Sequence, residues 1–224
     1  MPPNASLELF VADDIAEAAA RRFLSLDPRT IALAGGSTPR RMYERLATSD
    51  FAWAESHVFF GDERCVAPDD AASNYRMASE ALLSKVGANV HRMPGESCDA
   101  EAYEAELRSL FTAESPTFDV ALLGLGEDGH TASLFQGDAA LEINDRWVAH
   151  VERPDYARLT LTLPILSASR VAMFLVAGAA KRAALRQLLD GDDIPAARVA
   201  AETIVVIADR SAMPLGYGSR AKTA

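Results

Sequence analysis

Short apolar runs alternate with amphipathic segments along most of the chain. Phe118–Leu123 is the clearest of these runs, and it is apolar on both sides of the pleat, as expected for a parallel strand covered on both faces. Similar runs or apolar–polar alternation predict further strands. We expect strands at 7–11, 30–34, 57–60, 90–93, 118–123, 147–151, within 158–166, and at 171–177 and 203–208.

Apolar residues at helical spacing predict helices between these strands. Asp13 or Asp14 can cap the first helix, Pro39 suits the first turn of the second, and Ser73 or Asn74 can cap the third. Helices are also expected at 101–111 and 178–189, and one beginning near Thr131 or Ser133. This alternation predicts an α/β fold, with a doubly wound, mostly parallel sheet and helices on both faces. We expect residues 1–224 to form a single domain.

Composition and charge narrow the function classes. A net charge of −10 argues against binding to nucleic acids or anionic membranes, so an anionic small substrate would need a local basic pocket. Cys65 and Cys98 are too few for a disulfide framework, which fits a reduced, cytoplasmic setting. The beginning of the chain lacks a signal-peptide pattern, and the longest apolar run, 171–180, is too short to span a bilayer.

A glycine-rich turn follows the strand at 118–123. Gly124, Gly126 and Gly129 match a dinucleotide-binding fingerprint, but several strands precede it and Asp128 would lie close to a pyrophosphate. A second interpretation makes His130 a helix-start residue whose polar atoms are satisfied by backbone groups. A third makes His130 a general base or acid that Asp128 orients, at the strand end where open α/β sheets bind ligands.

A second turn, Gly35-Gly36-Ser37-Thr38-Pro39, connects a predicted strand to a predicted helix. Free backbone N–H groups, two hydroxyls and the positive end of a helix dipole would together form a cradle for an anion. The turn lacks the Lys-Ser/Thr pair of a Walker A loop. The alternative is an ordinary tight turn with a Ser or Thr cap.

Charged residues near other strand ends are further candidates. Asp62, Glu63 and Arg64 directly follow the predicted strand at 57–60, where they could be solvated loop residues or part of a pocket. Arg158 begins another strand. Lys181 lies in the first turn of a predicted helix, against the dipole preference, so either an anion binds nearby or the lysine is simply exposed.

These motifs together resemble those of the 6-phosphogluconolactonase family over nearly the whole chain. The resemblance implies the fold of the glucosamine-6-phosphate deaminase and ribose-5-phosphate isomerase group. It also implies hydrolysis of 6-phosphoglucono-δ-lactone in the pentose phosphate pathway, with no metal or organic cofactor. Ala67 and Gln136 stand where relatives usually carry proline, which affects local loop shape. The motifs are LAGGSTP at 33–39, FFGDER at 59–64, SNY at 73–75, GLGEDGHTASLF at 124–135, RLTLTLPIL at 158–166 and AGAAK at 177–181.

Lactone hydrolysis needs an activated water, donors for an oxyanion and a held substrate. We assign His130 as the base, Asp128 as its support and Arg64, with backbone N–H groups, to the oxyanion. By resemblance, Arg158 and Lys181 occupy phosphate-holding positions. The expected partner is a small phosphorylated sugar lactone, and the chain is expected to be a monomer or a weak homo-oligomer. The expected substrate-binding residues are Gly35, Gly36, Ser37, Thr38, Asp62, Glu63, Asn74, Gly129, Arg158 and Lys181.

Two other functions remain open on the sequence. One is a sugar-phosphate deaminase or isomerase of the same fold group. Such deaminases usually continue Asp-Gly-His into Asn-Glu-Pro and carry Asp-Glu-Tyr where this chain has Asp62-Glu63-Arg64. The other is a non-catalytic sugar-phosphate sensor, which needs the anion cradle but not His130.

Overall fold

An eight-stranded sheet forms the centre of the computed structural model, which describes residues 6–111, 118–217 and 222–223. The strand order is β11-β1-β10-β9-β6-β2-β3-β5, and each pairing within it is parallel. The predicted mostly parallel sheet is therefore confirmed, although β11 was not expected. The strands are β1 (Ser6–Val11), β2 (Thr30–Leu33), β3 (His57–Phe60), β5 (Asn89–Val90), β6 (Val120–Gly124), β9 (Val171–Val176), β10 (Thr203–Ala208) and β11 (Lys222–Thr223).

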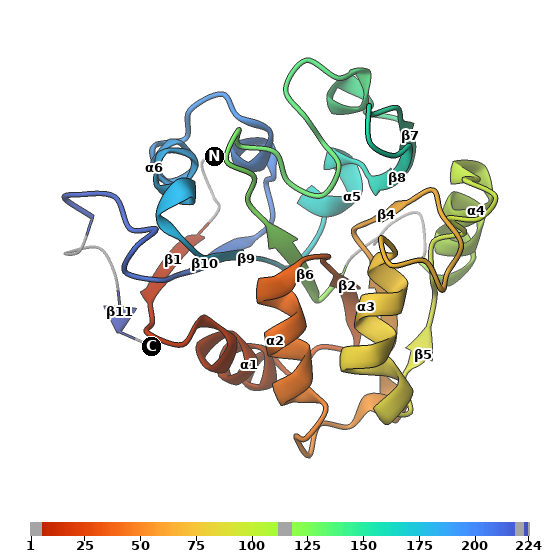
Figure 1. Cartoon of the computed structure of the whole chain (residues 1–224), viewed down its shortest axis with the longest axis horizontal. Helices are drawn as coiled ribbons and strands as arrows, with labels where there is room; N and C mark the ends of the chain where they lie inside the picture. Colours follow the sequence, from red (N-terminus) through yellow and green to blue (C-terminus); the bar gives the residue numbers. More distant parts are fainter. Residues whose placement is uncertain (1–5, 112–117, 218–221, 224) are drawn as a thin grey trace.

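Helices cover both faces of this sheet, as predicted. α1, α2 and α3 lie on one side, and α5 and α6 lie on the other (Figure 1). The α-helices are α1 (Ile15–Leu26), α2 (Ser37–Leu46), α3 (Asn74–Ala81), α4 (Ala100–Leu110), α5 (Leu163–Ser167) and α6 (Arg182–Asp190). Short 3₁₀ turns are η1 (Trp53–Glu55), η2 (Leu83–Lys85), η3 (Ala139–Glu142), η4 (Ala179–Lys181) and η5 (Pro195–Arg198).

Polar side chains begin two of these helices as the sequence predicts. The Asp14 carboxylate accepts a hydrogen bond from the backbone N–H of Glu17 in α1. The Ser73 hydroxyl accepts one from the N–H of Arg76 in α3. Each bond satisfies an N–H group that has no partner within its own helix, which fixes where the helix starts.

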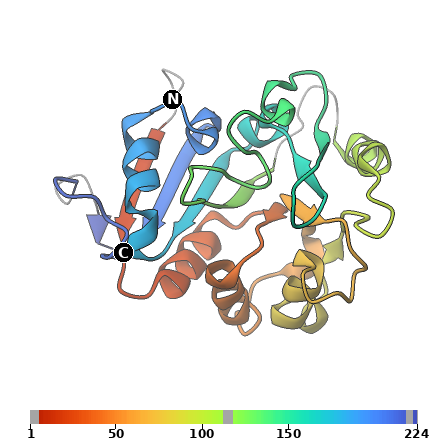
Figure 2. The same ribbon diagram turned by 45° about the horizontal axis from the view of Figure 1, so that its top comes forward.

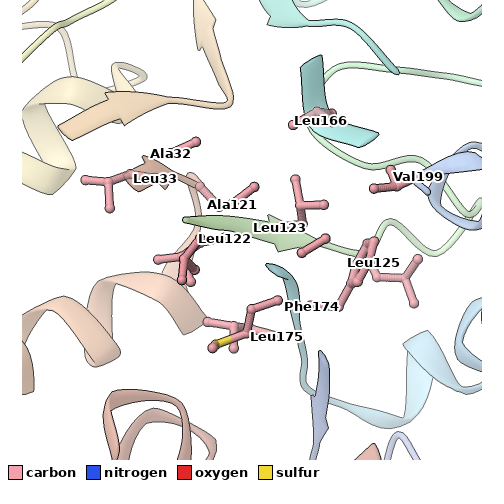
Figure 3. Packing of buried hydrophobic residues seen from close by; sticks show 14 of the residues in the cluster. Ala32, Leu33, Ala121, Leu122, Leu123, Leu125, Leu166, Phe174, Leu175 and Val199 are labelled. Carbon is pink, nitrogen blue, oxygen red and sulfur yellow. The ribbon is translucent and has the colours of Figure 1, made fainter. Parts of the chain in front are cut away.

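β6 lies in the middle of the sheet, between β9 and β2, and its side chains are buried on both faces. Figure 3 shows Leu122 pointing to one side of the strand, and Leu166 and Val199 packing above the other side. This two-sided burial explains the continuous apolar run in the sequence. The buried residues of the described chain form one hydrophobic cluster.

A second, antiparallel sheet was not predicted. It consists of β4 (Asp62–Arg64), β8 (Arg158–Leu161) and β7 (Val148–Val151), in the order β4-β8-β7. It lies next to the carboxyl edge of the large sheet (Figure 2). Arg64 pairs directly with Arg158 in its register. The predicted strands at 147–151 and 158–166 therefore exist in part, but they do not join the parallel sheet.

The helix expected after His130 does not form, so that prediction was wrong. The Thr131 hydroxyl donates to the carbonyl of Gly124 at 2.8 Å, and Ala132 adopts a left-handed φ of 47°. The Ser133 N–H donates to the Thr160 hydroxyl at 3.1 Å. These hydrogen bonds, one to Gly124 and one to Thr160, replace those that a helix would make.

The strand predicted within 158–166 ends early. β8 stops at Leu161, and Leu163–Ser167 forms the short helix α5, with Pro164 in its first turn. Proline is well suited to that place because its missing N–H is not needed there. The apolar–polar alternation of 159–163 therefore overstated the length of the strand.

Cys65 and Cys98 form a disulfide, although the sequence was interpreted as favouring reduced thiols. The two residues are 33 positions apart, and their Cα atoms lie 5.1 Å from each other. Cys65 directly follows β4, and Cys98 directly precedes the N-cap of α4. A pair of cysteines this distant in sequence gives no spacing signal, so only the fold could show their proximity.

Candidate active site

A cleft of about 310 Å³ opens at the carboxyl ends of four neighbouring strands, β9, β6, β2 and β3. Open α/β sheets bind ligands at this edge. Ten of the predicted site residues line the cleft, although they come from distant parts of the chain. They are Gly35, Gly36, Ser37, Thr38, Asp62, Arg64, Asn74, His130, Arg158 and Lys181.

His130 and Asp128 form a hydrogen-bonded pair at the end of β6. Nδ1 of His130 lies 2.5 Å from Oδ1 of Asp128, and the His130 N–H also approaches this oxygen, at 3.2 Å. Partial burial opposes ionisation of Asp128, but the hydrogen bonds from His130 prevail and lower the pKa of its carboxyl. An ionised carboxylate only accepts hydrogen bonds, so Nδ1 carries the proton. Nε2 is therefore the nitrogen left to take a proton in the cleft.

Gly126 allows this pair to sit close to the backbone. A Cβ at Gly126 would overlap the imidazole ring of His130 and the carboxylate of Asp128. The Gly126 N–H donates to the His130 carbonyl at 2.8 Å, which closes the turn. Gly126 is thus needed for the histidine–carboxylate pair, and the dinucleotide interpretation is not required to explain it.

Phe135 is part of the same turn and was missed as a site residue. Its ring centroid lies 4.5 Å from that of His130, on one side of the imidazole. The guanidinium of Arg153 lies over the same phenyl ring, 4.1 Å from its centroid. Phe135 therefore restricts the orientation of His130. The sequence signal was its place in the GHTASLF motif, which does not reveal a contact with the imidazole ring.

Asp62, Asn74 and Arg64 form a polar network along the wall of the cleft. The Asn74 amide donates to Oδ1 of Asp62 at 3.2 Å, and its Oδ1 accepts from Nη1 of Arg64 at 3.1 Å. Ser133 donates its hydroxyl to Oδ2 of Asp62 at 2.6 Å. Nε of Arg64 is buried, and no acceptor for it lies within 6–111, 118–217 or 222–223. The network fixes the guanidinium of Arg64 at the wall of the cleft.

Glu63 and Gly129 do not line the cleft, unlike most of the predicted substrate-binding residues. The Glu63 carboxylate is buried and accepts hydrogen bonds from the backbone N–H groups of Asn74 and Tyr75 and from the Ser73 hydroxyl. Burial raises the pKa of Glu63 despite these donors. Glu63 therefore holds the start of α3. Gly129 has a φ of 83° and packs against Ile194, so its role is conformational.

The turn from Gly35 to Thr38 faces the cleft at the start of α2. Gly36 is the N-cap with a φ of 107°, and no side chain caps the helix. The first N–H groups of α2 thus point at the cleft with the positive end of the helix dipole. The buried Tyr43 hydroxyl accepts from the Ala34 N–H at 2.9 Å and donates to the Ala34 carbonyl at 2.8 Å. This contact, which the sequence did not reveal, fixes the turn.

Arg158 and Lys181 bring positive charge to the same cleft. Arg158 pairs with Arg64 in adjacent strands, an arrangement in which like charges repel. Asp155 balances part of this charge through an ion pair of 2.5 Å with Nη2 of Arg158. Within the described parts of the chain, Lys181 makes no ion pair, and Nε of Arg158 is buried without an acceptor. A bound anion would relieve this repulsion and pair with Lys181.

One cluster of potential metal ligands lies outside the cleft. Among the residues that the structure describes, Cys65, Cys98 and His150 are the one group of three or more such side chains with ligand atoms within 4.8 Å of one another. No described helix is long and apolar enough to cross a membrane.

The chain is similar in sequence and in structure to proteins of one known family. Residues 2–207 match the family described as glucosamine-6-phosphate isomerases/6-phosphogluconolactonase. The chain is 46% identical to a 6-phosphogluconolactonase of Synechocystis over 169 residues, which cover 71% of this chain and 70% of that protein. It is similar to the crystal structure of 6-phosphogluconolactonase from Thermotoga maritima, with a TM-score of 0.82 and 31% identity, covering 92% of this chain and 100% of that one.

A monomeric glucosamine-6-phosphate deaminase has the same fold. Its TM-score is 0.78 at 21% identity, and the match covers 92% of this chain and 98% of that chain. This likeness confirms the predicted fold group. It does not distinguish between the activities that the fold supports.

Proposed function

Because the chain belongs to the glucosamine-6-phosphate isomerase/6-phosphogluconolactonase family, we propose that it is a 6-phosphogluconolactonase. Its reaction is the hydrolysis of 6-phosphoglucono-δ-lactone to 6-phosphogluconate, a step of the pentose phosphate pathway. One observation carries the proposal: the His130–Asp128 pair lies at the same cleft as an anion cradle and three cationic side chains. We further propose that the chain acts as one domain.

The phosphate group binds at the cationic side of the cleft. The backbone N–H groups at the start of α2 and the hydroxyls of Ser37 and Thr38 donate to its oxygens. Arg158 and Lys181 supply the charge that a dianion needs in a protein with a net charge of −10. Binding at this end places the lactone ring toward His130.

His130 acts on the water that attacks the lactone. Nε2 takes a proton from this water while the oxygen forms a bond to the carbonyl carbon, and Asp128 stabilises the resulting imidazolium. The carbonyl electrons move onto the oxygen, which accepts hydrogen bonds from Arg64. When the carbonyl re-forms, the bond to the ring oxygen breaks. His130 returns its proton to that oxygen, which becomes the C5 hydroxyl of the product.

A direct assay tests the proposal. Freshly prepared 6-phosphoglucono-δ-lactone is mixed with the protein, and acid release is followed by pH-stat with spontaneous hydrolysis subtracted. We expect enzyme-dependent hydrolysis that His130→Ala lowers strongly and that His150→Ala, a change outside the cleft, leaves unchanged. Tight binding of 6-phosphogluconate without hydrolysis above background would instead favour the sugar-phosphate sensor.

A further inference from the structure

The disulfide between Cys65 and Cys98 lies in a place where the backbone keeps the two sulfurs together. The Cys65 N–H donates to the Ala157 carbonyl, and the Cys98 N–H donates to the Pro94 carbonyl, each at 2.8 Å. A Cβ at Gly95 would lie only 2.6 Å from the carbonyl oxygen of Arg64, so the two segments are in tight backbone contact. Reduction of the disulfide therefore leaves two thiols close to each other.

His150 completes a cluster with these sulfurs. It lies on β7, and a ring nitrogen and both Sγ atoms lie within 4.8 Å of one another. Its imidazole is 40% exposed, and its contact with Glu152 is long, at 3.5 Å from Nε2. The ring therefore already lies where one of its nitrogens could share an ion with the sulfurs. The three ligand atoms come from three separate segments, around β4, before α4 and on β7.

We propose that Cys65, Cys98 and His150 bind one zinc ion when the disulfide is reduced. Two thiolates and an imidazole form a ligand set that suits zinc, which is usually four-coordinate in such sites. A cavity of about 440 Å³ opens beside Cys98 and His150 and is also lined by Asp99 and Glu101. It leaves room for a water molecule or a carboxylate as the fourth ligand.

The two states of the site exclude each other. A dithiol reductant supplies two electrons and two protons, which break the S–S bond and give two thiols, while the dithiol becomes a disulfide. Zinc binding then releases the two thiol protons and forms two Zn–S bonds. In the oxidised protein the sulfurs are bonded to each other and no thiolate is available, so the disulfide form does not bind zinc at this site.

This site is separate from the cleft that carries the proposed lactonase activity. None of its three ligands lines that cleft. Cys65 directly follows Arg64 in the chain, so the disulfide, or a zinc ion in its place, holds the segment next to a proposed catalytic residue. Because the two sites share no residue, zinc binding and lactone hydrolysis can be measured independently.

The experiment uses the full chain, reduced with dithiothreitol, treated with a chelator and desalted without oxygen. Zinc affinity is measured by competition with a chromophoric chelator, and Co²⁺ serves as a spectroscopic probe. We expect one zinc per reduced chain, cobalt spectra with thiolate-to-metal charge-transfer bands, and no binding by the oxidised chain. His150→Ala should weaken zinc binding by about tenfold or more, and Cys65→Ser with Cys98→Ser should abolish it.

Ser97→Ala, a change in the same cavity, is the matched control and should bind zinc like the wild type. Circular dichroism and the lactonase assay verify that each variant is folded. The proposal is overturned if the reduced wild type binds zinc no more tightly than the double serine variant. It is also overturned if His150→Ala binds zinc with unchanged affinity, because two thiols alone would then account for the binding.

Discussion

The hydrogen bond between Asp128 and His130 decides which imidazole nitrogen is available for chemistry. Histidine tautomers cannot be derived from a sequence, and Asp-Gly-His alone left the protonated nitrogen of His130 undetermined. The 2.5 Å contact with a carboxylate of lowered pKa assigns the proton to Nδ1. The side chain of Asp128 is 61% exposed, so its contribution is to orient the imidazole rather than to supply a buried charge.

Replacing His130 tests the general base. His130→Ala should lower kcat by about 10²–10⁴-fold, the usual contribution of a positioned general base. The Tm should change little because the His130 side chain is already 32% exposed. Steady-state hydrolysis of the lactone and thermal unfolding measure the two effects. An enzyme that keeps most of its activity over background after this change would show that another group activates the water.

Replacing Arg158 or Lys181 tests the proposed phosphate site. Arg158→Ala or Lys181→Ala removes a charge-assisted contact to phosphate, which should cost about 1.5–3 kcal/mol of binding free energy. The change should appear mainly as a higher KM for the phosphorylated lactone. Glucono-δ-lactone without the phosphate is the control substrate, and its hydrolysis should be much less affected. Equal losses with both lactones would contradict the phosphate assignment.

The sequence indicated the chemical groups of the site better than their supporting contacts. His130, Arg64, Arg158 and Lys181 were all predicted, and the fold brings them to one cleft. The contact of Ser133 with Asp62 was not predicted, because 71 positions separate these residues in the chain. The contact of the Phe135 ring with His130 was not predicted either, since an aromatic residue in a motif gives no indication of the ring it will contact.

At the scale of secondary-structure elements, the local sequence pattern predicted a strand correctly where both faces of the strand are buried. It failed where side chains hydrogen-bond to residues elsewhere in the fold. β6 agrees closely with the run Phe118–Leu123 because a central parallel strand is buried on both faces. The segment from Thr131 to Ser133 has helix-starting residues, but their polar groups bond to Gly124, Thr160 and Asp62 instead. Such tertiary hydrogen bonds outweigh the local tendency to start a helix, and they can be seen only in the folded structure.

Asp119 connects three strands at the edge of the sheet opposite the cleft. Its Oδ2 accepts from the N–H groups of Arg29 at 2.8 Å and Thr30 at 3.0 Å, just before and at the start of β2. Its Oδ1 accepts from Nη1 of Arg170 at 3.0 Å, next to β9. Burial acts to raise the pKa of Asp119, but these hydrogen bonds outweigh it and the pKa is lowered.

The lowered pKa gives a pH-dependent stability. The ionised form of Asp119 is favoured by folding, so its stabilising effect is present above the ordinary value of 3.8 and is lost as pH falls through the lower folded-state pKa. Asp119→Asn should lower the free energy of unfolding by about 1–3 kcal/mol at neutral pH. Urea unfolding at a series of pH values should show the difference from wild type shrinking below 3.8. A difference that is constant with pH would exclude this charge effect.

At the scale of the whole molecule, the order of the strands in the sheet determines which side chains can lie in the same cleft. β9, β6, β2 and β3 are neighbours in the sheet, but of these four only β2 and β3 are consecutive strands in the chain. The carboxyl ends of all four supply most of the cleft. Strand–helix alternation predicted the parallel sheet and therefore the edge where the site lies. It did not predict that β4, β8 and β7 leave this sheet to form a second one. That sheet aligns Arg64 with Arg158, a pairing that depends on antiparallel register rather than on local sequence.

The shared fold makes the choice between lactonase and deaminase depend on the site. A deaminase must open a sugar ring, move protons between adjacent carbons and release ammonia, which requires a carboxylate for proton transfer in addition to the one that orients the histidine. Deaminases of this fold usually carry such a glutamate close behind the histidine, in Asn-Glu-Pro. After His130, the next carboxylate in the chain is Asp138. Its Oδ2 lies 3.5 Å from Nη1 of Arg153, and Asp138 does not line the cleft.

We therefore expect hydrolysis of 6-phosphoglucono-δ-lactone and no detectable ammonia from glucosamine 6-phosphate. Lactone hydrolysis needs one base, the role proposed for His130, and Arg64 suits an oxyanion or a carboxylate product better than ring-opening acid–base chemistry. Both substrates carry the same 6-phosphate, so the phosphate site favours neither, and the difference reports on the reacting end of the cleft. Ammonia and fructose 6-phosphate are measured in parallel with lactone loss on the same preparation. Stoichiometric ammonia, with lactone loss no faster than background, would reverse the assignment.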